Sequence, residues 1–483
     1  MTIFIFLIFG LFTSFLFPPY FIFPLGFIIF PFLCFYFDKN LKKLNKKKIF
    51  INCFAFGATF FGSFLIWMQS PFYIFEETRY LFFLSLIFII FLSILFSTIF
   101  TLIIFYNKLT PSFFSVPIIF VLTEFIISNI FSGFPWVTFS LIVSNIELFS
   151  YIFKYFGTFL TSYIVLQVYC IPYYFFSKNE RLNVFRFSFF VTLPLVLIIL
   201  STQLIYKPIN NEEILNVEIF QINKSASINK NLAEKELSIL LDLISKSKSQ
   251  LLVFAENNYP YLINNFDFHR IQKNLKADQT VIIGGTRIQE GKYFNTMFSI
   301  NTKEVNFFDK IQLVPFGEFL PFRKFLGFFE PISGSNDYIP GTKERIIIED
   351  NYFSFIPVIC YEIIFYWKLF NSKNSNSNLI INITNDLWFG NYFGPYQHLY
   401  LTKIRAAEFN KFLIRVSNNG ISAIINNKGQ IIKNTKLFER TNLSYKIKLQ
   451  SNQNYYFIHN LLNIYLCILF FIFIIINIKR NYA

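Results

Sequence analysis

The segment from Ser354 to Phe365 has the sequence SFIPVICYEIIF, and the rest of the chain is organised around it. Its apolar, β-branched first half predicts a buried strand that ends at Cys360, and residues 363–370 resume a pattern that a helix could carry. A thiol at a strand-to-helix turn meets the positive end of a helix dipole and free backbone N–H groups, which lower its pKa and can hold an oxyanion. A single cysteine at a strand end is more often a small buried apolar residue, so Cys360 needs reactive partners from elsewhere.

The composition predicts a membrane protein with a separate water-soluble part. The chain has 483 residues, of which 54% are hydrophobic, and a mean hydropathy of +0.47. It is too apolar for a soluble globule and too long to be only a set of membrane spans. The net charge is +15, but the densest basic cluster, at 38–48, lies between two apolar runs, which favours membrane orientation over nucleic-acid binding.

The cysteines and histidines indicate neither a disulfide framework nor a metal site. Four of the five cysteines lie in apolar segments, which leaves Cys360 alone in the polar part of the chain, and the three histidines are widely scattered. We therefore expect no metal and no cofactor.

Eight apolar runs predict about eight membrane spans, of which seven precede the polar part and one follows it. They are 3–17, 21–37, 49–67, 80–105, 113–130, 148–176, 187–205 and Leu461 to Ile478. Lysine and arginine concentrate in alternate loops, including 38–48 and the segment that contains Lys178 and Arg181. By the positive-inside rule both termini are cytoplasmic, so the region between spans seven and eight faces outward.

The polar region between the last two spans predicts an α/β domain with its own core. Helical patterns fall at 231–248 and 396–410 and intermix with strand-like runs. These runs are Leu215 to Ile222, Leu251 to Ala255, Thr280 to Ile288, Phe294 to Ile300, Glu344 to Glu349, Phe353 to Ile359, Asn378 to Thr384, Phe412 to Ser417 and Ile421 to Asn426.

Three strand ends in this domain carry a reactive residue. Glu256 follows the run that begins at Leu251, Lys310 follows VNFFD at 305–309, and Cys360 ends the central strand. The three fit one mechanism, in which Glu256 takes the thiol proton, Lys310 stabilises the thiolate and then the oxyanion, and Cys360 attacks a carbonyl. Taken singly, Glu256 and Lys310 would more often be solvated or salt-bridged surface residues.

These elements resemble those of the nitrilase, or carbon–nitrogen hydrolase, superfamily, and further motifs resemble its membrane-embedded branch, the apolipoprotein N-acyltransferase family. The motifs are DKIQLVPFGE at 309–318, CYE at 360–362, NITNDLWFG at 382–390, GPYQH at 394–398, RAAE at 405–408 and RVSNNG at 415–420, with FPPY at 17–20 and GFPW at 133–136 in the membrane part.

The resemblance implies a helical membrane bundle of about eight spans that carries a nitrilase-like αββα sandwich. The implied domains are a membrane domain at 1–206, a periplasmic catalytic domain at 207–456, and a final span with a short cytoplasmic tail at 457–483. The implied location is the bacterial cytoplasmic (inner) membrane.

The implied reaction has two steps. Cys360 takes a fatty acyl group from a phospholipid as a thioester, and then passes it to the α-amine of the diacylglyceryl-cysteine at the N-terminus of an apolipoprotein. In this mechanism Glu256 is the base and Lys310 the oxyanion residue. Glu318 and Glu362 are implied to position Lys310 and the site, although both could equally be structural ion-pair partners.

Several residues are candidates for substrate contacts. The Phe-rich stretch around Arg323 and Lys324, with Phe325 and Phe328, suggests a lid that dips into the membrane interface, and packing into a core is equally compatible with it. Tyr361 is expected to shape the pocket beside the nucleophile. The aromatic cluster of Trp388, Phe389, Tyr392 and Phe393, next to Asn385, could line an acyl pocket, whereas we expect His398 to be structural.

Two other functions use the same sequence features. A membrane-tethered amidase or hydrolase would employ the same three residues with water as the acceptor, and the fold alone does not decide between them. A transporter or scaffold is disfavoured because the spans contain almost no ionisable residue apart from Glu124 and Glu147.

Overall fold

The computed structural model describes most of the chain. The described residues are 2–40, 45–106, 112–176, 209–224, 230–264, 268–327, 330, 334, 336–341, 344–345, 348–350, 352–370, 376–451, 459–465 and 467–468. The chain divides into two compact units, one comprising 1–69, 81–207 and 455–483 and the other comprising 70–80 and 208–454.

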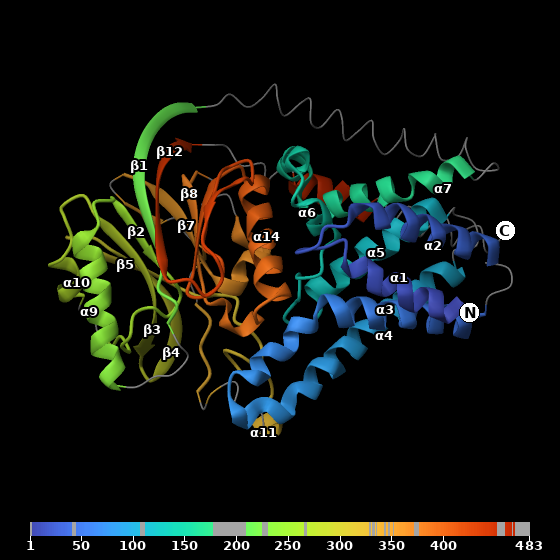
Figure 1. The fold of residues 1–483 in the computed structure, drawn as a ribbon, viewed down its shortest axis with the longest axis horizontal. Coiled ribbons are helices and arrows are strands. Elements are labelled where there is room, and N and C mark those ends of the chain that lie inside the picture. Colours follow the sequence, from blue (N-terminus) through green and yellow to red (C-terminus); the bar gives the residue numbers. More distant parts are fainter. Residues whose placement is uncertain are drawn as a thin grey trace. The chain divides into compact units, whose positions relative to one another are not determined.

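The first unit is helical (Figure 1). Its described elements are α1 (Thr2–Ser14), η1 (Phe23–Leu25), α2 (Gly26–Asn40), α3 (Lys46–Phe64), α4 (Phe83–Tyr106), α5 (Ser112–Asn129), η4 (Phe139–Val143), α6 (Glu147–Tyr169) and α7 (Ile171–Phe176), and the short elements η2 (Ile66–Tyr73) and η3 (Glu76–Phe82) continue into the second unit.

Close backbone contacts and phenylalanine rings hold this unit together. A Cβ atom added at Gly10 would lie 2.2 Å from the carbonyl oxygen of Phe56, so α1 and α3 pack backbone against backbone. The ring of Phe56 lies 5.7 Å from that of Phe96 and 5.8 Å from that of Phe120, measured between centroids. Rings from α3, α4 and α5 therefore share one apolar interior.

Among the described residues, one helical segment is long and apolar enough to cross a membrane, namely Glu76–Phe105. The pair Lys46–Phe64 and Ile66–Tyr73, bent by 47°, could form a second span, and Thr2–Ser14 and Phe113–Asn129 are shorter apolar helices. The expected span at 148–176 is two helices, α6 and α7, and α6 is itself interrupted at Gly157, whose φ is 68°. The expected span at 187–205 and most of Leu461 to Ile478 lie outside the described residues, so the number of spans stays a prediction.

The second unit contains two six-stranded sheets (Figure 1). The first has the order β12-β1-β2-β3-β4-β5, with β1 (Ile209–Gln221), β2 (Leu251–Phe254), β3 (Thr280–Gln289), β4 (Lys292–Ile300), β5 (Val305–Asp309) and β12 (Thr441–Ser451). The second has the order β11-β10-β9-β8-β7-β6, with β6 (Ile348–Glu349), β7 (Ser354–Ile359), β8 (Leu379–Thr384), β9 (Phe412–Ser417), β10 (Ala423–Ile425) and β11 (Ile431–Asn434).

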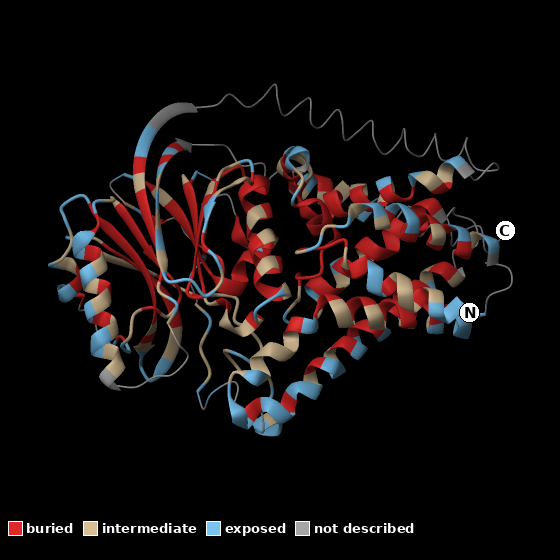
Figure 2. Ribbon diagram, viewed as in Figure 1, coloured by how far each residue is buried: buried red, intermediate tan, exposed pale blue. Residues whose placement is uncertain are grey.

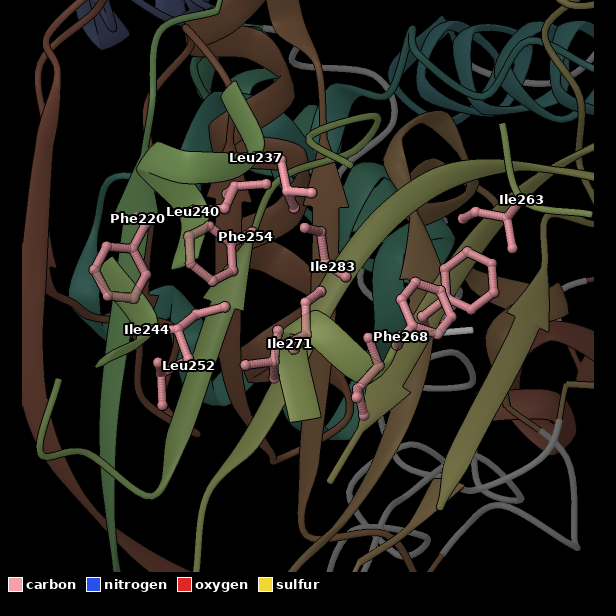
Figure 3. Close-up of a cluster of buried hydrophobic side chains, with 13 residues drawn as sticks. Phe220, Leu237, Leu240, Ile244, Leu252, Phe254, Ile263, Phe268, Ile271 and Ile283 are labelled. Carbon is pink, nitrogen blue, oxygen red and sulfur yellow. The ribbon is translucent and has the colours of Figure 1, made fainter. Parts of the chain in front are cut away.

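The two sheets lie between helices, which gives four layers. Helix α9 (Lys230–Lys246) and the short α10 (His269–Gln272) cover the first sheet, and α14 (Phe393–Glu408) covers the second (Figure 1). Leu237, Leu240 and Ile244 of α9 enter a buried cluster with Phe254 and Ile283 of the sheet (Figure 3). The strands of both sheets are largely buried, whereas the outer face of α9 is exposed (Figure 2). This is the αββα arrangement expected from the sequence.

Each sheet has three parallel strands at its centre, β1-β2-β3 and β7-β8-β9. Of these strands, β2, β7 and β8 are almost continuously apolar because both of their faces are buried, which is why the sequence predicts them well. Two strands were not predicted. β11 is a partly exposed hairpin strand, and β12 alternates lysine with apolar residues and pairs antiparallel with β1, more than half the domain away along the chain.

Candidate active site

Glu256 lies at the carboxyl end of β2 in a turn that the neighbouring strand permits. The backbone N–H of Ala255 donates to Asn258 Oδ1 at 2.9 Å, which closes the turn. A Cβ atom at Gly284 on β3 would lie 2.7 Å from the Cα atom of Glu256, so only glycine allows this approach. Glu256 is 5% exposed and therefore not a surface carboxylate.

Lys310 directly follows β5, and its ammonium group lies between two carboxylates. Its Nζ is 3.4 Å from Glu256 Oε1 and 2.8 Å from Glu318 Oε1. Its backbone is fixed as well, since its N–H donates to the carbonyl of Asn295 and its own carbonyl accepts from the N–H of Gly341, both at 2.8 Å. Lys310 is 1% exposed.

Asn295 of β4 joins the two carboxylates, and the sequence did not identify it. Its Nδ2 donates to Glu256 Oε1 and to Glu318 Oε1, each at 2.7 Å. Glu318 is held further by the N–H of Val314, which donates to its Oε2 at 2.8 Å. The only signal in the sequence is an amide side chain within a strand-like run, because a buried polar group in such a place needs partners.

Cys360 follows the last residue of β7 and has an unusual backbone. Its φ is 48°, in the left-handed region that side chains with a Cβ atom seldom adopt, and such strain is found mainly at functional sites. Cys360 is 5% exposed, and its thiol lies close enough to the Glu256 carboxylate to affect the pKa of that carboxylate. The structure therefore brings together the side chains of Glu256, Lys310 and Cys360 from three strand ends in two sheets.

Glu362 ties the nucleophile turn to the loop after Lys310. Its Oε1 accepts the N–H groups of Ile311 at 2.8 Å and Gln312 at 3.1 Å, and its Oε2 accepts that of Ile359 at 2.9 Å. The charge of Glu362 is balanced by Arg345, whose Nη2 lies 2.7 Å from Glu362 Oε1. Both side chains are buried, and the hydrogen bonds from Ile311 and Gln312 to Glu362 link the end of the first sheet to the turn that follows β7 in the second.

Arg345 was also missed by sequence reasoning. Its guanidinium donates to the carbonyl of Pro357 on β7 and lies over the ring of Phe308 on β5, 4.8 Å from the ring centroid. Arg345 therefore contacts β5 and β7, two of the three strands that lead into the site. Nothing in the local sequence, a polar stretch of lysine, glutamate and arginine, distinguishes it from a surface residue.

The electrostatics of the site favour a neutral thiol beside a charged lysine. Burial raises the pKa of Glu256, although the charge of Lys310 opposes this shift. Burial would lower the pKa of Lys310, but the charges of Glu318 and Glu256 outweigh it and hold that pKa above its usual value. The ammonium group thus stays protonated, as an oxyanion partner must.

The expectation that a helix dipole lowers the pKa of Cys360 is wrong. The element after β7, η6 (Cys360–Ile364), is a single short 3-10 turn, followed by α13 (Tyr366–Leu369), so its dipole is small. Burial raises the pKa of the thiol instead, and the charge of Glu256 raises it further. Proton removal by an adjacent base is therefore required for attack.

The candidate substrate residues fall into two groups. Tyr361 is buried next to the site, and the charge of Lys310 acts on it. Asn385 and Trp388 are half-buried at the element η7 (Asp386–Phe389), and neither has a hydrogen bond or ring contact to the three central residues within the described part of the chain. Phe325, on the short helix α11 (Arg323–Leu326), is 83% exposed, and Phe328 lies outside the described residues.

His398, which we expect to be structural, is fully buried, and its Nδ1 lies 2.9 Å from Asp386 Oδ1. No group of three or more potential metal ligands occurs among the residues that the structure describes.

Comparison with known families agrees with this geometry. Residues 219–457 match the family described as carbon-nitrogen hydrolase, and residues 9–171 match the apolipoprotein N-acyltransferase N-terminal domain. The fold and the first match define the second unit as a domain of the carbon–nitrogen hydrolase class.

Relatives along nearly the whole chain make the assignment more specific. The apolipoprotein N-acyltransferase of Aquifex aeolicus is 27% identical over 400 residues, which cover 81% of this chain and 88% of the relative. That of Rickettsia bellii is 28% identical over 460 residues, covering 90% and 89%. The chain belongs to the apolipoprotein N-acyltransferase family.

Among solved structures, a CN-hydrolase superfamily protein from Xanthomonas campestris is 16% identical and has a TM-score of 0.38, covering 49% of this chain and 91% of that protein. At this level the structural likeness has no bearing on the assignment.

Proposed function

We propose that Cys360, Glu256 and Lys310 perform the acyl transfer characteristic of this family. The observation that carries the proposal is their convergence, because Lys310 Nζ lies 3.4 Å from Glu256 Oε1, and Glu256 and the Cys360 thiol are close enough for each to affect the pKa of the other. Membership of the family makes the chain an N-acyltransferase of lipoproteins. The residue roles follow from the chemistry of the site.

In the first step the Cys360 thiol loses its proton to Glu256, and the sulfur attacks the ester carbonyl of a phospholipid. The carbonyl oxygen becomes negative and is stabilised by the ammonium group of Lys310. The ester bond then breaks, and the lysophospholipid leaves with the proton from Glu256. The acyl group remains on Cys360 as a thioester.

In the second step the α-amine of a diacylglyceryl-cysteine attacks this thioester. Glu256 accepts a proton from the amine, the carbon–sulfur bond breaks, and the sulfur recovers a proton as the amide forms. Glu318 and Asn295 hold Lys310 and Glu256 in place throughout, whereas Glu362 and Arg345 fix the nucleophile turn. The step needs no redox partner because the acyl carbon keeps its oxidation state.

The acceptor is tested by the product. Supplied with a phospholipid and a diacylated lipopeptide, the protein is expected to yield N-acylated lipopeptide and lysophospholipid. If water is the acceptor, free fatty acid accumulates and the lipopeptide keeps its mass. A Cys360→Ser variant is the control, since it should yield neither product, and a binding or transport protein would be unaffected by that change.

The proposed arrangement in the membrane has three parts, a span-containing domain at 1–206, the catalytic domain at 207–456 and a final span at 457–483. The compact units divide at Lys207 and Asn454, which supports these bounds, although residues 70–80 group with the catalytic unit. The long apolar segment Glu76–Phe105 supports membrane insertion. We place both termini in the cytoplasm and the catalytic domain outside, on the charge distribution of the loops.

The stretch around α11 is proposed to meet the lipid surface. Phe322 and Phe325 are 79% and 83% exposed, so they do not pack into the core. Arg323, between them, is tied to the chain by an ion pair with Asp337, and Lys324 is exposed. Exposed aromatic rings beside cations suit the boundary between acyl chains and phosphates.

Replacing Phe322 and Phe325 with serine tests this contact. Because both rings are exposed, thermal stability should be unchanged, whereas acylation of Cys360 from phospholipid vesicles should slow about tenfold as apolar contact with the bilayer is lost. A short-chain substrate dissolved as monomers should react at the normal rate. Tyr352→Ser, an exposed aromatic change before β7, is the control. If the double serine variant acylates Cys360 from vesicles at the same rate as the unsubstituted protein, the proposed contact between the α11 stretch and the lipid surface is wrong.

A further inference from the structure

Behind the nucleophile lies a buried polar network that the mechanism above does not use. Its centre is Arg415 on β9, which is fully buried. Arg415 Nη2 lies 2.6 Å from Asp386 Oδ2. Arg415 Nη1 donates to Asn382 Oδ1 at 3.1 Å and to Thr402 Oγ1 at 3.0 Å. So many directed hydrogen bonds fix the positions of the residues around Arg415.

Two residues of β8 connect this network to Cys360. Asn382 Nδ2 donates to the carbonyl oxygens of Val358 at 3.2 Å and Cys360 at 3.4 Å. Strands β7 and β8 are parallel, with Ile359 paired to Ile383, so the next position on each strand places Thr384 beside Cys360. The Thr384 hydroxyl donates to Asp386 Oδ1 at 3.1 Å.

We propose that Thr384 is a catalytic residue whose hydroxyl contacts the sulfur of Cys360 and stabilises the thiolate, and that the Asp386–Arg415 pair positions this hydroxyl. The inference rests on the proposed role of Cys360 as nucleophile. It goes beyond the three residues of the mechanism because it gives the sulfur a neutral hydrogen-bond donor in addition to the charged base.

The proton balance of the step is simple. With a neutral thiol, the Thr384 hydroxyl donates to Asp386, and the single proton of the thiol is directed to Glu256. Once Glu256 has taken the thiol proton, the hydroxyl rotates and donates to the thiolate, and it keeps its own proton. Only one proton moves, from Cys360 to Glu256.

The charges around the sulfur explain why such a donor is useful. Burial, Glu256 and Asp386 raise the pKa of the thiol. Lys310 and the hydrogen bond from Thr384 lower it. Arg415 balances the charge of Asp386, and burial together with Arg415 lowers the pKa of His398 to about 4, so that this histidine is neutral at neutral pH and adds no charge.

Alkylation of Cys360 by iodoacetamide tests the proposal without any lipid. The Thr384→Val variant keeps the shape of the side chain and loses the hydroxyl. Its rate of alkylation, followed on the peptide that contains Cys360, should fall about tenfold at a pH below the pKa of the thiol, since a hydrogen bond to a charged group is worth roughly one pKa unit. Thr384→Ser should restore the rate.

Thr402→Val is the matched control. Thr402 is as deeply buried as Thr384 and is also bonded to Arg415, but it lies on α14 and has no contact with the sulfur among the contacts of the described residues. The rate at which Cys360 is alkylated in Thr402→Val should lie within about twofold of the rate in the unsubstituted protein. Normal alkylation of Thr384→Val, or an equal loss in Thr402→Val, would overturn the proposal. If Cys360 forms no thioester with phospholipid, the proposed function is rejected. The alkylation rates still report on the contact between Thr384 and Cys360, because that test uses no lipid.

Discussion

Replacing Lys310 with methionine is expected to slow acylation of Cys360 by about a hundredfold to a thousandfold, the usual scale for loss of one oxyanion partner. The ammonium group is the charge that the structure places against both Glu256 and Glu318. Without it the developing oxyanion has no cation, and the pKa of Glu256 rises further because the charge that lowers it is gone. The measurement is the single-turnover rate of thioester formation from phospholipid.

This variant needs a companion because it leaves two buried carboxylates without a cation. Removal of one member of a buried ion pair costs about 3–5 kcal/mol of folding free energy. Adding Glu318→Gln removes one negative charge, and this double variant should regain thermal stability while remaining inactive. Lys303→Met, the loss of an exposed cation outside the site and the α11 stretch, should behave normally. A Lys310→Met protein that acylates Cys360 within tenfold of the normal rate would exclude Lys310 from the mechanism.

Replacing Glu256 with glutamine should reduce the same rate by about a hundredfold to ten-thousandfold, the range for loss of a general base. The pH dependence gives a second reading of the same residue. Burial raises the pKa of Glu256 above the 4.5 of a free glutamate side chain. The base works only when ionised, so activity is present above the raised pKa and is lost as the pH falls through it.

The fall in rate on the acid side of the pH profile should therefore lie above pH 4.5. It should be absent in Glu256→Gln, because that variant has no carboxylate at position 256 to be protonated. Glu304→Gln, a change in an exposed carboxylate, should leave this fall in rate in place. A fall on the acid side that survives unchanged in Glu256→Gln would assign the titration to another group.

The sequence was sufficient to predict the central strands and the three reactive ends. β2 and β7 are nearly pure apolar runs, and each is followed closely by a residue with reactive chemistry, Glu256 and Cys360. The motif at 309–318 also indicated that Lys310 and Glu318 belong to one site. Such local patterns are visible because burial on both faces of a parallel strand leaves little choice of residue type.

Partners supplied by distant strands were not predictable. Asn295 and Arg345 reach the site only because the fold brings β4, β5 and β7 together. The periodicity of residues along a single strand does not show which other strands it will contact. The pKa of Cys360 was predicted in the wrong direction because a local argument from a helix dipole omitted the burial of the thiol within the folded domain. Thr384 lay within a recognised motif, yet its role required the register between β7 and β8.

The most direct test of the account is intact-mass analysis of the protein after incubation with a phospholipid of one acyl composition and no acceptor. The account predicts a gain of one acyl mass, localised to Cys360 as a thioester, and its loss when a diacylated lipopeptide is added. An acyl group on another residue, or no adduct in protein that still N-acylates the lipopeptide, would contradict it.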